Sequence, residues 1–203
     1  MNYRPHCIEL NTPIPQEPVL FFKPDSAYAT DKNPFFLPDF SQEIHYETEL
    51  VVKISKLGKN IAEKFAHRYY EEFTLGLDMT ARDIQNEARS KGLPWTTSKG
   101  FDQSAIVGKF LAKDCFNLQA LHFHLDINGE RRQEGFTGDM IFSIDQLVSY
   151  ASRFFTLKTG DLIFTGTPMG VGPVAINDTL EAYVGERKLF DLECFIEIGR
   201  AHV

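Results

Sequence analysis

The chain has 203 residues, 43% of them hydrophobic and 24% charged, and its 28 acidic and 21 basic residues give a formal net charge of −7. These values suit one globular domain with its own core, and they exclude a collagen, a coiled coil or a chain that is disordered over its length. The Lys and Arg residues are scattered, so we expect no nucleic-acid partner. No apolar run reaches the 18 residues of a membrane span, so we expect no membrane partner.

The N-terminus and the cysteines predict the cellular location. The first residues, MNYRPHC, lack the apolar core of a signal peptide. The three cysteines, Cys7, Cys115 and Cys194, are far apart and unpatterned, which is typical of a reducing compartment and argues against thiolate metal sites. We therefore expect a cytoplasmic protein.

Residues 1–40 hold seven prolines and cannot form a long helix. We expect loops, short edge strands and a mobile arm or lid there. His6 and Glu9 lie three residues apart in this arm and would face each other on a single helical turn. A Glu that orients a His makes a competent general base, although terminal pairs of this kind are usually just solvated.

Four elements are expected in the next part of the chain. Alternating apolar and polar residues predict a strand over residues 43–54 with one apolar and one polar face. A helix over residues 62–70 and a short buried strand over residues 73–77 follow. Thr80 is then a suitable N-cap for a helix that ends at Gly92.

The second half of the chain is richer in strands. Alternation over residues 121–127 leads into the Asn-Gly pair at positions 128–129, which predicts a β-hairpin. Ser143 and Gln146 form a capping box for an amphipathic helix. Short strands and Gly-rich turns occupy residues 161–198. The pattern as a whole predicts an α+β fold with two or three helices.

Three carboxylates form the candidate metal site. Glu47 and Glu49 share one face of the predicted strand, about 6.6 Å apart, and would repel each other in a closed space unless a cation joined them. The alternative is a solvated strand face. Asp78 ends a buried strand just before a helix, where it either caps a loop or completes an all-oxygen site that suits Mg²⁺ or Mn²⁺.

Basic and amide side chains follow the third carboxylate. Arg82, Gln85 and Arg89 share a helix face, and Lys99 lies in a Gly-flanked loop. With a cation they would form a positive pocket for a small anionic substrate such as a 2-oxo acid. The alternative is that the arginines pair with acidic neighbours or solvent on the helix surface.

Two further motifs carry weaker signals. The Gly-rich turn over residues 165–173 lacks the ending of a phosphate loop, so we reject nucleotide binding, but its backbone N–H groups are suited to hold a carboxylate. His122 and His124 form a His-x-His pair without a third ligand, which favours a surface strand over a metal site.

Many ordered segments of the chain resemble one enzyme family. They are Asn2-Tyr3-x-x-His6-x-x-Glu9, EPVLFFKP at 17–24, HYETEL at 45–50, LDMTARDIQ at 77–85, KGLPW at 91–95, NGE at 128–130, DMIF at 139–142 and residues 160–173. Together they resemble the fumarylacetoacetate hydrolase family, specifically its small acylpyruvase-like members. The resemblance implies a mixed β-roll or sandwich of the fumarylacetoacetase C-terminal-domain type with flanking helices, a homodimer and a Mg²⁺ or Mn²⁺ cofactor. We expect an arm or lid with edge segments over residues 1–40 and the catalytic β-roll over residues 41–203.

The resemblance also implies roles for nine residues. The metal ligands are Glu47, Glu49 and Asp78, the catalytic residues are His6, Glu9 and Lys99, and the substrate-binding residues are Arg82, Gln85 and Thr167. The implied reaction is the hydrolysis of a C–C bond in a small 2,4-dioxo acid through a metal-chelated enolate. Oxaloacetate decarboxylation or keto–enol isomerisation at the same site is the first alternative.

The second alternative is a catalytically weak metal-binding protein. Relatives of the acylpyruvase type have a short strand before the Asn-Tyr pair and an acidic residue before the histidine. Here the chain begins at that pair, and Pro5 precedes His6. From these departures we expect a weakly anchored His6 arm.

Overall fold

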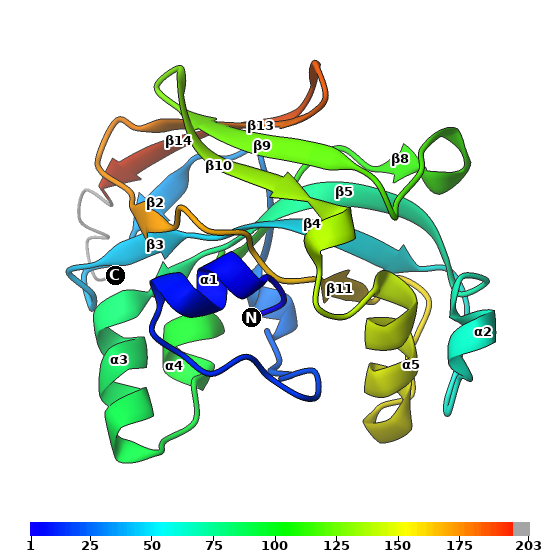
Figure 1. Cartoon of the computed structure of the whole chain (residues 1–203). Coiled ribbons are helices and arrows are strands. Elements are labelled where there is room, and N and C mark those ends of the chain that lie inside the picture. Colours follow the sequence, from blue (N-terminus) through cyan, green and yellow to red (C-terminus); the bar gives the residue numbers. More distant parts are fainter. Residues whose placement is uncertain (197–203) are drawn as a thin grey trace, which may run out of the picture.

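Three β-sheets form the body of the molecule, and most of the helices lie along one side of them, which confirms the predicted α+β class (Figure 1). The structure is a computed structural model and describes residues 1–196. Within those residues, no helix is long and apolar enough to cross a membrane.

The first sheet carries the acidic strand. Its order is β1-β7-β5-β4-β11, and β8 also pairs with β5. The strands span Tyr28–Thr30 (β1), Thr48–Ile54 (β4), Tyr70–Asp78 (β5), Ala105–Val107 (β7), Leu111–Ala112 (β8) and Leu162–Phe164 (β11). Every residue of β4 except Lys53 is buried. The alternative of a solvated strand face is therefore wrong here, because both faces of the strand are covered.

The second sheet packs against the first across the main core. Its order is β10-β9-β13-β14-β2. The strands span Phe35–Leu37 (β2), His122–Ile127 (β9), Glu130–Phe136 (β10), Thr179–Val184 (β13) and Arg187–Ile196 (β14). Asn128 and Gly129 join β9 to β10 with φ angles of 54° and 80°, which are the positive values of a type I′ turn. The predicted hairpin is confirmed.

The third sheet is small and lies where the expected long strand breaks. It consists of β12 (Gly172–Pro173), β3 (Ile44–Tyr46) and β6 (Thr80–Ala81). The single strand predicted over residues 43–54 is wrong, because β3 pairs with β6 and β12 whereas β4 pairs with β5 and β11. The chain changes sheets at Glu47, which places this residue at the junction.

The helices differ from their predicted bounds for physical reasons. The helix expected over residues 62–70 is only α2 (Glu63–Ala66), because Tyr70 already pairs with Ile54 in the sheet. The N-cap of α3 (Arg82–Lys91) is Ala81 and not Thr80, which belongs to β6. The left-handed Gly92, with a φ of 66°, ends α3 as predicted.

The remaining helices flank the sheets. They are α1 (Arg4–Glu9), α4 (Thr96–Lys99), α5 (Ile144–Phe154) and three 3₁₀ turns over Asp25–Ala27, Lys113–Cys115 and Thr137–Asp139. Ser143 and Gln146 form the predicted capping box of α5. In Figure 1, α1 lies below β3 and in front of α4.

The N-terminal arm is joined to the body through Asn2. Its side-chain amide donates to the carbonyls of Phe142 (2.9 Å) and Thr165 (2.8 Å) and accepts from the Phe142 N–H (2.8 Å). The two edge strands expected from this region are β1 and β2, each at the end of its sheet. The arm thus carries α1 to the β11 end of the first sheet.

Candidate active site

Three buried carboxylates converge where β4 begins and β5 ends. One oxygen or more from each of Glu47, Glu49 and Asp78 lies within 4.8 Å of the others. The strand register explains the meeting, since Thr48 lies opposite Leu77 and the Asp78 N–H donates to the Glu47 carbonyl at 2.9 Å. All three side chains are nearly inaccessible to solvent. The structure therefore brings together the three residues proposed from the sequence.

Lys99, at the end of α4, is bound to two carboxylates of this cluster. Its Nζ donates to Glu47 Oε2 (2.7 Å), Asp78 Oδ2 (2.7 Å) and Thr80 Oγ1 (2.6 Å). Burial lowers the pKa of Lys99, but the carboxylates of Asp78 and Glu47 outweigh this effect and raise the pKa above its ordinary value. Lys99 is thus a charged ammonium that holds two of the carboxylates.

Arg82 joins the cluster from the first turn of α3. Its Nη2 donates to Glu47 Oε1 at 2.5 Å, and its Nη1 donates to Gln85 Oε1, one turn along, at 2.5 Å. Surface pairing is therefore wrong for Arg82, whereas Arg89 is exposed. Burial raises the pKa of Glu47, but Lys99 and Arg82 lower it well below its ordinary value, so Glu47 stays ionised.

Lys23 is a site residue that sequence reasoning missed. Its Nζ lies 2.7 Å from Asp78 Oδ1 and donates to the Lys99 carbonyl and to the carbonyl and hydroxyl of Ser104. Burial lowers the pKa of Lys23, and Asp78 opposes this shift. In the sequence, Lys23 is a single lysine after an apolar run, and that run does not indicate a contact with Asp78, 55 positions away.

The cluster fits a divalent cation. Asp78 Oδ1 is buried and accepts no hydrogen bond of good geometry, in spite of the nearby Lys23. Glu49 accepts the Gly166 N–H at 2.6 Å, yet burial and the neighbouring Asp78 raise its pKa to about 8. An unpaired oxygen on Asp78 and a raised pKa on Glu49 are together the expected state of a cation site of hard oxygen donors.

The predicted His6–Glu9 pair forms on α1, within range of the charge of Glu47. His6 Nδ1 lies 2.9 Å from Glu9 Oε2 on one turn of α1, as predicted, and His6 is 2% exposed. Burial lowers the pKa of His6, although Glu47 and Glu9 act in the opposite direction. The imidazole is therefore neutral at pH 7. With Nδ1 turned to Glu9, its Nε2 is left to accept a proton.

The Gly-rich turn holds two of these carboxylates, as its backbone N–H groups suggested. Gly166 donates to Glu49, and the Gly170 N–H donates to Glu9 Oε1 at 2.9 Å. Gly170 has a φ of +96°, and a Cβ there would lie 2.4 Å from the Arg132 carbonyl oxygen, so the turn requires glycine. Thr167 is buried in the same turn.

The histidines of β9 lie outside the site. His122 stacks on Phe136 with ring centroids 4.4 Å apart, and His124 stacks on Tyr183 at 4.8 Å. Among the described residues, the carboxylate cluster is the one group of three or more ligand residues that could hold a metal ion.

Comparisons with known proteins show what the whole chain is similar to. A family model described as "Fumarylacetoacetate (FAA) hydrolase C-terminal" matches residues 1–201. The mouse protein named mitochondrial oxaloacetate tautomerase FAHD1 is 47% identical over 182 residues, which cover 89% of this chain and 82% of that protein. The Dictyostelium discoideum protein named mitochondrial oxaloacetate decarboxylase is 44% identical over 175 residues, 85% of this chain and 80% of that protein.

Solved structures give the same picture. The fumarylpyruvate hydrolase from Pseudomonas aeruginosa, crystallised with Mn²⁺ and pyruvate, superposes with a TM-score of 0.88 and 35% identity over 97% of this chain and 87% of that one. A fumarylacetoacetate hydrolase family protein from Yersinia pestis superposes with a TM-score of 0.91 and 38% identity over 96% of this chain and 89% of that one. The named relatives are enzymes that act on small oxo acids.

Proposed function

The chain belongs to the fumarylacetoacetate hydrolase family and is an enzyme, and we propose that it hydrolyses a C–C bond in a small 2,4-dioxo acid of the acylpyruvate type. One observation carries the proposal. A buried histidine oriented by a glutamate is neutral at pH 7, and it lies close enough to the three-carboxylate cluster for the charge of Glu47 to act on its pKa. Hydrolysis needs both parts, a site that stabilises an enolate and a base that activates water.

We assign the cofactor as Mg²⁺ or Mn²⁺, held by Glu47, Glu49 and Asp78. When bound, such an ion is a Lewis acid that polarises the 2-oxo carbonyl of the substrate. The donor set of hard oxygens supports this choice. The P. aeruginosa relative with Mn²⁺ and pyruvate supports it as well.

His6 is the proposed general base. Its Nε2 takes a proton from water, and the resulting hydroxide attacks the distal acyl carbon. The bond between the acyl carbon and the neighbouring CH₂ group then breaks, and its electron pair stays on the CH₂ carbon. Protonation of this carbon gives pyruvate, and the acyl group leaves as a carboxylic acid, so that one water is consumed. Glu9 keeps the Nδ1 proton of His6 in place throughout.

The remaining assigned residues position the substrate. Arg82 and Gln85 are linked to each other beside Glu47, and Thr167 lies in the turn that also binds Glu49. We propose that these three bind the substrate's oxygens. Lys99 keeps Glu47 and Asp78 in place and stabilises negative charge as the C–C bond breaks.

Tautomerisation or decarboxylation of oxaloacetate is the second candidate. The names of the mouse and Dictyostelium relatives favour it, and either reaction uses the same enolate without activating water. The third candidate is a metal-binding protein with little catalysis. The links of Asn2 to Phe142 and Thr165 argue for a well-anchored arm and against this third reading.

Turnover assays of acetylpyruvate and oxaloacetate with Mg²⁺ test these candidates. We expect the wild type to cleave acetylpyruvate and the His6→Ala variant to lose this activity. An oxaloacetate activity that survives His6→Ala would show that hydrolysis needs this base and the oxaloacetate reaction does not. If the wild type turns over oxaloacetate alone, the second candidate replaces the first, and if it turns over neither, the enzyme proposals are wrong.

A homodimer in the cytoplasm completes the proposal. The family resemblance supports the dimer. The cysteines of the described chain are all free, and Cys7 and Cys194 are buried, which supports a reducing compartment, although the mouse relative is named mitochondrial. Light scattering after size exclusion tests the dimer, which predicts twice the mass of the chain.

A further inference from the structure

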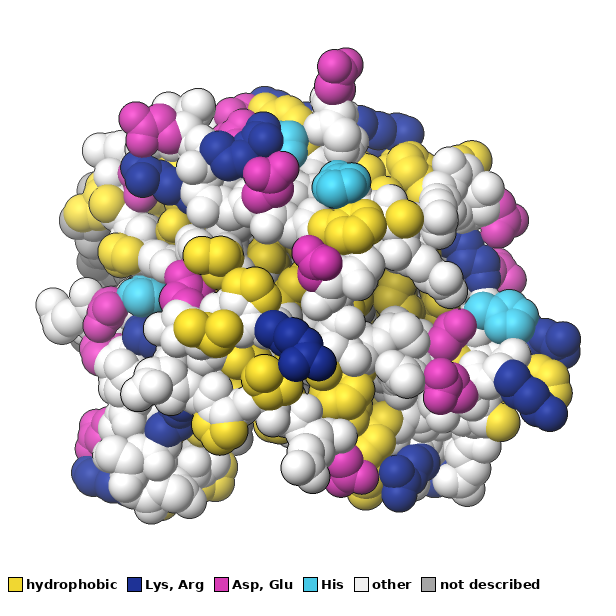
Figure 2. Space-filling model, viewed as in Figure 1, with side chains coloured by type: hydrophobic (Ala, Val, Ile, Leu, Met, Phe, Trp, Pro, Cys, Tyr) yellow, Lys and Arg dark blue, Asp and Glu magenta, His cyan; other side chains and the backbone are white. Residues whose placement is uncertain are grey.

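An apolar groove lies beside the carboxylate cluster. It has a volume of about 870 Å³ and runs between the segment that precedes the first 3₁₀ turn and the turn that precedes α4. Its lining includes Lys23 and the large apolar side chains of Leu20, Phe21, Phe22, Leu93 and Trp95. Figure 2 shows this face hollowed at its lower edge, between the lobes of α3–α4 and of α5, with hydrophobic side chains along the hollow.

The groove begins where the carboxylate cluster ends. The ring of Phe21 lines the groove, and its centroid lies 5.3 Å from Lys99 Nζ, which contacts Glu47 and Asp78. The same ring packs edge-on against Trp95, with centroids 6.1 Å apart. A molecule that is bound at the cluster and extends beyond it into the groove would therefore contact Phe21 first and then Trp95.

The charges of the groove select among possible occupants. Of the described residues that line it, Lys23 is the one cation, and its ammonium is already bound to Asp78, Ser104 and the Lys99 carbonyl. No lining cation therefore remains for a second carboxylate, whereas several large hydrophobic side chains are exposed along the groove. Such a lining favours a neutral, apolar group.

We propose that the groove binds the acyl substituent of the substrate, and that this substituent is an apolar chain or ring larger than methyl. The inference rests on the proposed function, because in a 2,4-dioxo acid the acyl carbon is two carbons away from the 2-oxo carbonyl. Its substituent must therefore leave the cluster. Phe21 and Trp95 are then the residues that set specificity.

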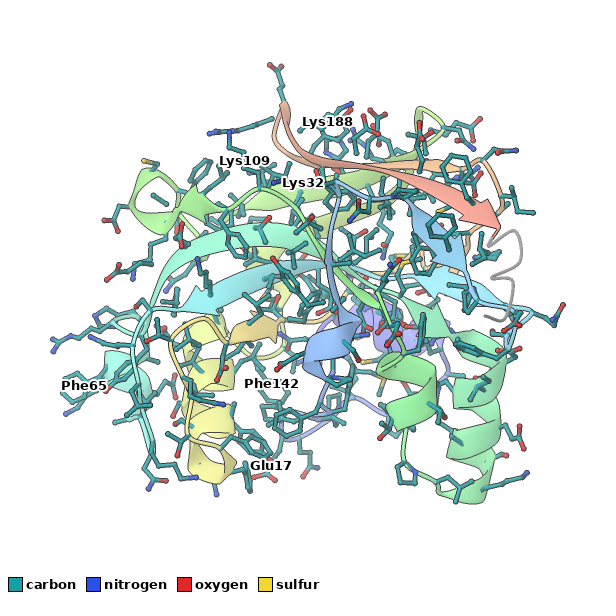
Figure 3. The ribbon with its side chains drawn as sticks, turned by 180° about the vertical axis from the view of Figure 1, so that it is seen from behind. Glu17, Lys32, Phe65, Lys109, Phe142 and Lys188 are labelled. Atoms are coloured by element: carbon teal, nitrogen blue, oxygen red, sulfur yellow. The ribbon has the colours of Figure 1, made fainter. Side chains whose placement is uncertain are left out.

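A series of substrates tests the groove. The specificity constant kcat/KM is measured for acetyl-, butanoyl- and hexanoylpyruvate with the Mg²⁺-loaded enzyme. Each added CH₂ that leaves water for an apolar groove should raise kcat/KM by about fourfold in the wild type. Phe21→Ala and Trp95→Ala should each flatten this rise. Phe65→Ala is the matched control, because Phe65 is 41% exposed and Phe21 is 42% exposed, and Phe65 lies on α2, far from α4 (Figure 3).

The outcomes separate the groove from the reaction. Turnover of all three substrates with no rise along the series overturns the groove and leaves the proposed function intact. No turnover of any acylpyruvate overturns both. A change in oligomeric mass for Phe21→Ala, together with a flat series, assigns the groove to a second copy of the chain and also overturns the proposal.

A second inference concerns Gln133, a buried residue of β10 that is 1% exposed and that sequence reasoning passed over. Its Oε1 accepts the Thr48 N–H at 2.9 Å, between Glu47 and Glu49. Its Nε2 donates to Thr167 Oγ1 at 2.8 Å and to the Pro168 carbonyl at 3.0 Å. The Thr48 donor and the Pro168 acceptor fix which end of the amide is which.

This arrangement determines the direction of the Thr167 hydroxyl. Since Thr167 Oγ1 accepts from Gln133, its own proton must be donated elsewhere. We infer that Gln133 is a positioning residue, which keeps the Thr167 hydroxyl as a donor to the substrate carboxylate and ties the turn of residues 165–173 to β4.

A double-mutant cycle tests this role. Gln133→Glu replaces the donor by an acceptor, so the Thr167 hydroxyl must turn toward it. We expect the KM for acetylpyruvate and the inhibition constant of oxalate to rise about tenfold, the loss of one hydrogen bond to a charged group, with a smaller change in kcat. In the Thr167→Val background the same substitution should change neither constant further.

Two results would overturn this role. If the effects of Gln133→Glu and Thr167→Val on KM are additive, Gln133 acts independently of Thr167. If kcat falls while KM and the oxalate constant stay unchanged, the substrate carboxylate is not involved. Gln133→Leu gives the same cycle should Gln133→Glu fail to fold, and Gln119→Glu, at an exposed position, controls for the added charge.

Discussion

The two halves of the candidate site are built in opposite ways. The carboxylate half lies where β4 and β5 pair, and this pairing runs along most of their length. Both faces of β4 are covered around Glu49. The base half lies on α1, a helix of six residues without a side-chain N-cap. A helix this short has little stability of its own and depends on docking. Figure 1 shows α1 beside the strands and outside them.

This difference assigns a separate task to each half. Lys99 and Arg82 hold Glu47 in a fixed place, so the charged groups need no rearrangement when substrate arrives. α1 is held by the polar links of Asn2 and by the contact of Glu9 with Gly170. A short helix that is joined to the body through such links, and not through strand pairing of its own, can open and close, which lets a substrate reach a buried cluster.

The largest expected effect comes from the rigid half. Glu49→Gln should lower Mg²⁺ affinity by more than about 100-fold and should abolish turnover. Loss of a residue that merely hydrogen-bonds to a metal ligand already lowers affinity by about 10- to 100-fold, and loss of a ligand should cost more. The metal-free variant should be no less stable than the wild type, because burial and Asp78 already disfavour the Glu49 carboxylate. Calorimetric titration with Mg²⁺ and thermal unfolding measure both effects.

Glu72→Gln is the matched control for that experiment. Glu72 lies on β5 and pairs with Lys53 at 2.8 Å on the surface, so its loss should leave Mg²⁺ affinity unchanged. Equal Mg²⁺ affinity in Glu49→Gln and the wild type would remove Glu49 from the ligand set.

The next largest effect comes from the base on α1. His6→Ala should lower kcat for acetylpyruvate by about 10²- to 10⁴-fold, the usual contribution of a general base. Mg²⁺ affinity should change little, because His6 is on the other half of the site. His67→Ala, at an exposed position, should leave both quantities unchanged. A parallel loss of Mg²⁺ affinity in His6→Ala would mean that the two halves are not separate.

A moderate effect is expected from Asn2, whose hydrogen bonds join the arm that carries α1 to the body of the protein. Asn2→Ala leaves the Thr165 carbonyl and the Phe142 backbone groups without their partners, at a cost of about 1–3 kcal/mol to the docked arm. Hydrogen exchange of residues 4–10 should become faster, whereas exchange in β4 and β5 should stay slow. Faster exchange in all of these segments would contradict an arm that opens on its own.

The smallest effect is a pH dependence. Burial lowers the pKa of His6 below its ordinary value of 6.5, so an undocked arm takes up a proton near pH 6.5 and a docked arm does so only at lower pH. The contribution of His6 to docking is complete above pH 6.5 and is lost as the pH falls toward the lower, docked pKa. The acid limb of kcat/KM should have its midpoint below 6.5, and a midpoint above 6.5 would argue against a buried, neutral His6.

The sequence predicts the chemistry of the site better than its local structure. Alternation places Glu47 and Glu49 on one face, but it treats residues 43–54 as one strand, because the change of sheet at Glu47 depends on the distant partners β6 and β12. Local hydrophobic patterns also cannot distinguish a solvated polar face from a buried one. Glu49 is buried because other parts of the fold cover both faces of β4.

Residues whose roles depend on distant contacts escape sequence reasoning. Gln133 and Lys23 sit in stretches with no chemical motif, and their partners are 34 to 85 positions away. His6 and Glu9, by contrast, are three residues apart, so a helical turn alone brings them together. The Asn-Gly turn and the capping box of α5 are equally local, and both are confirmed.

The most direct test of the central claim is a crystal structure of the enzyme grown with Mn²⁺ and oxalate, with the metal located by its anomalous scattering. The account predicts one Mn²⁺ bound by Glu47, Glu49 and Asp78, with oxalate completing the coordination and α1 closed over it. An anomalous peak elsewhere, or Glu47 and Asp78 still bound to their lysine and arginine partners with no metal beside them, would contradict it.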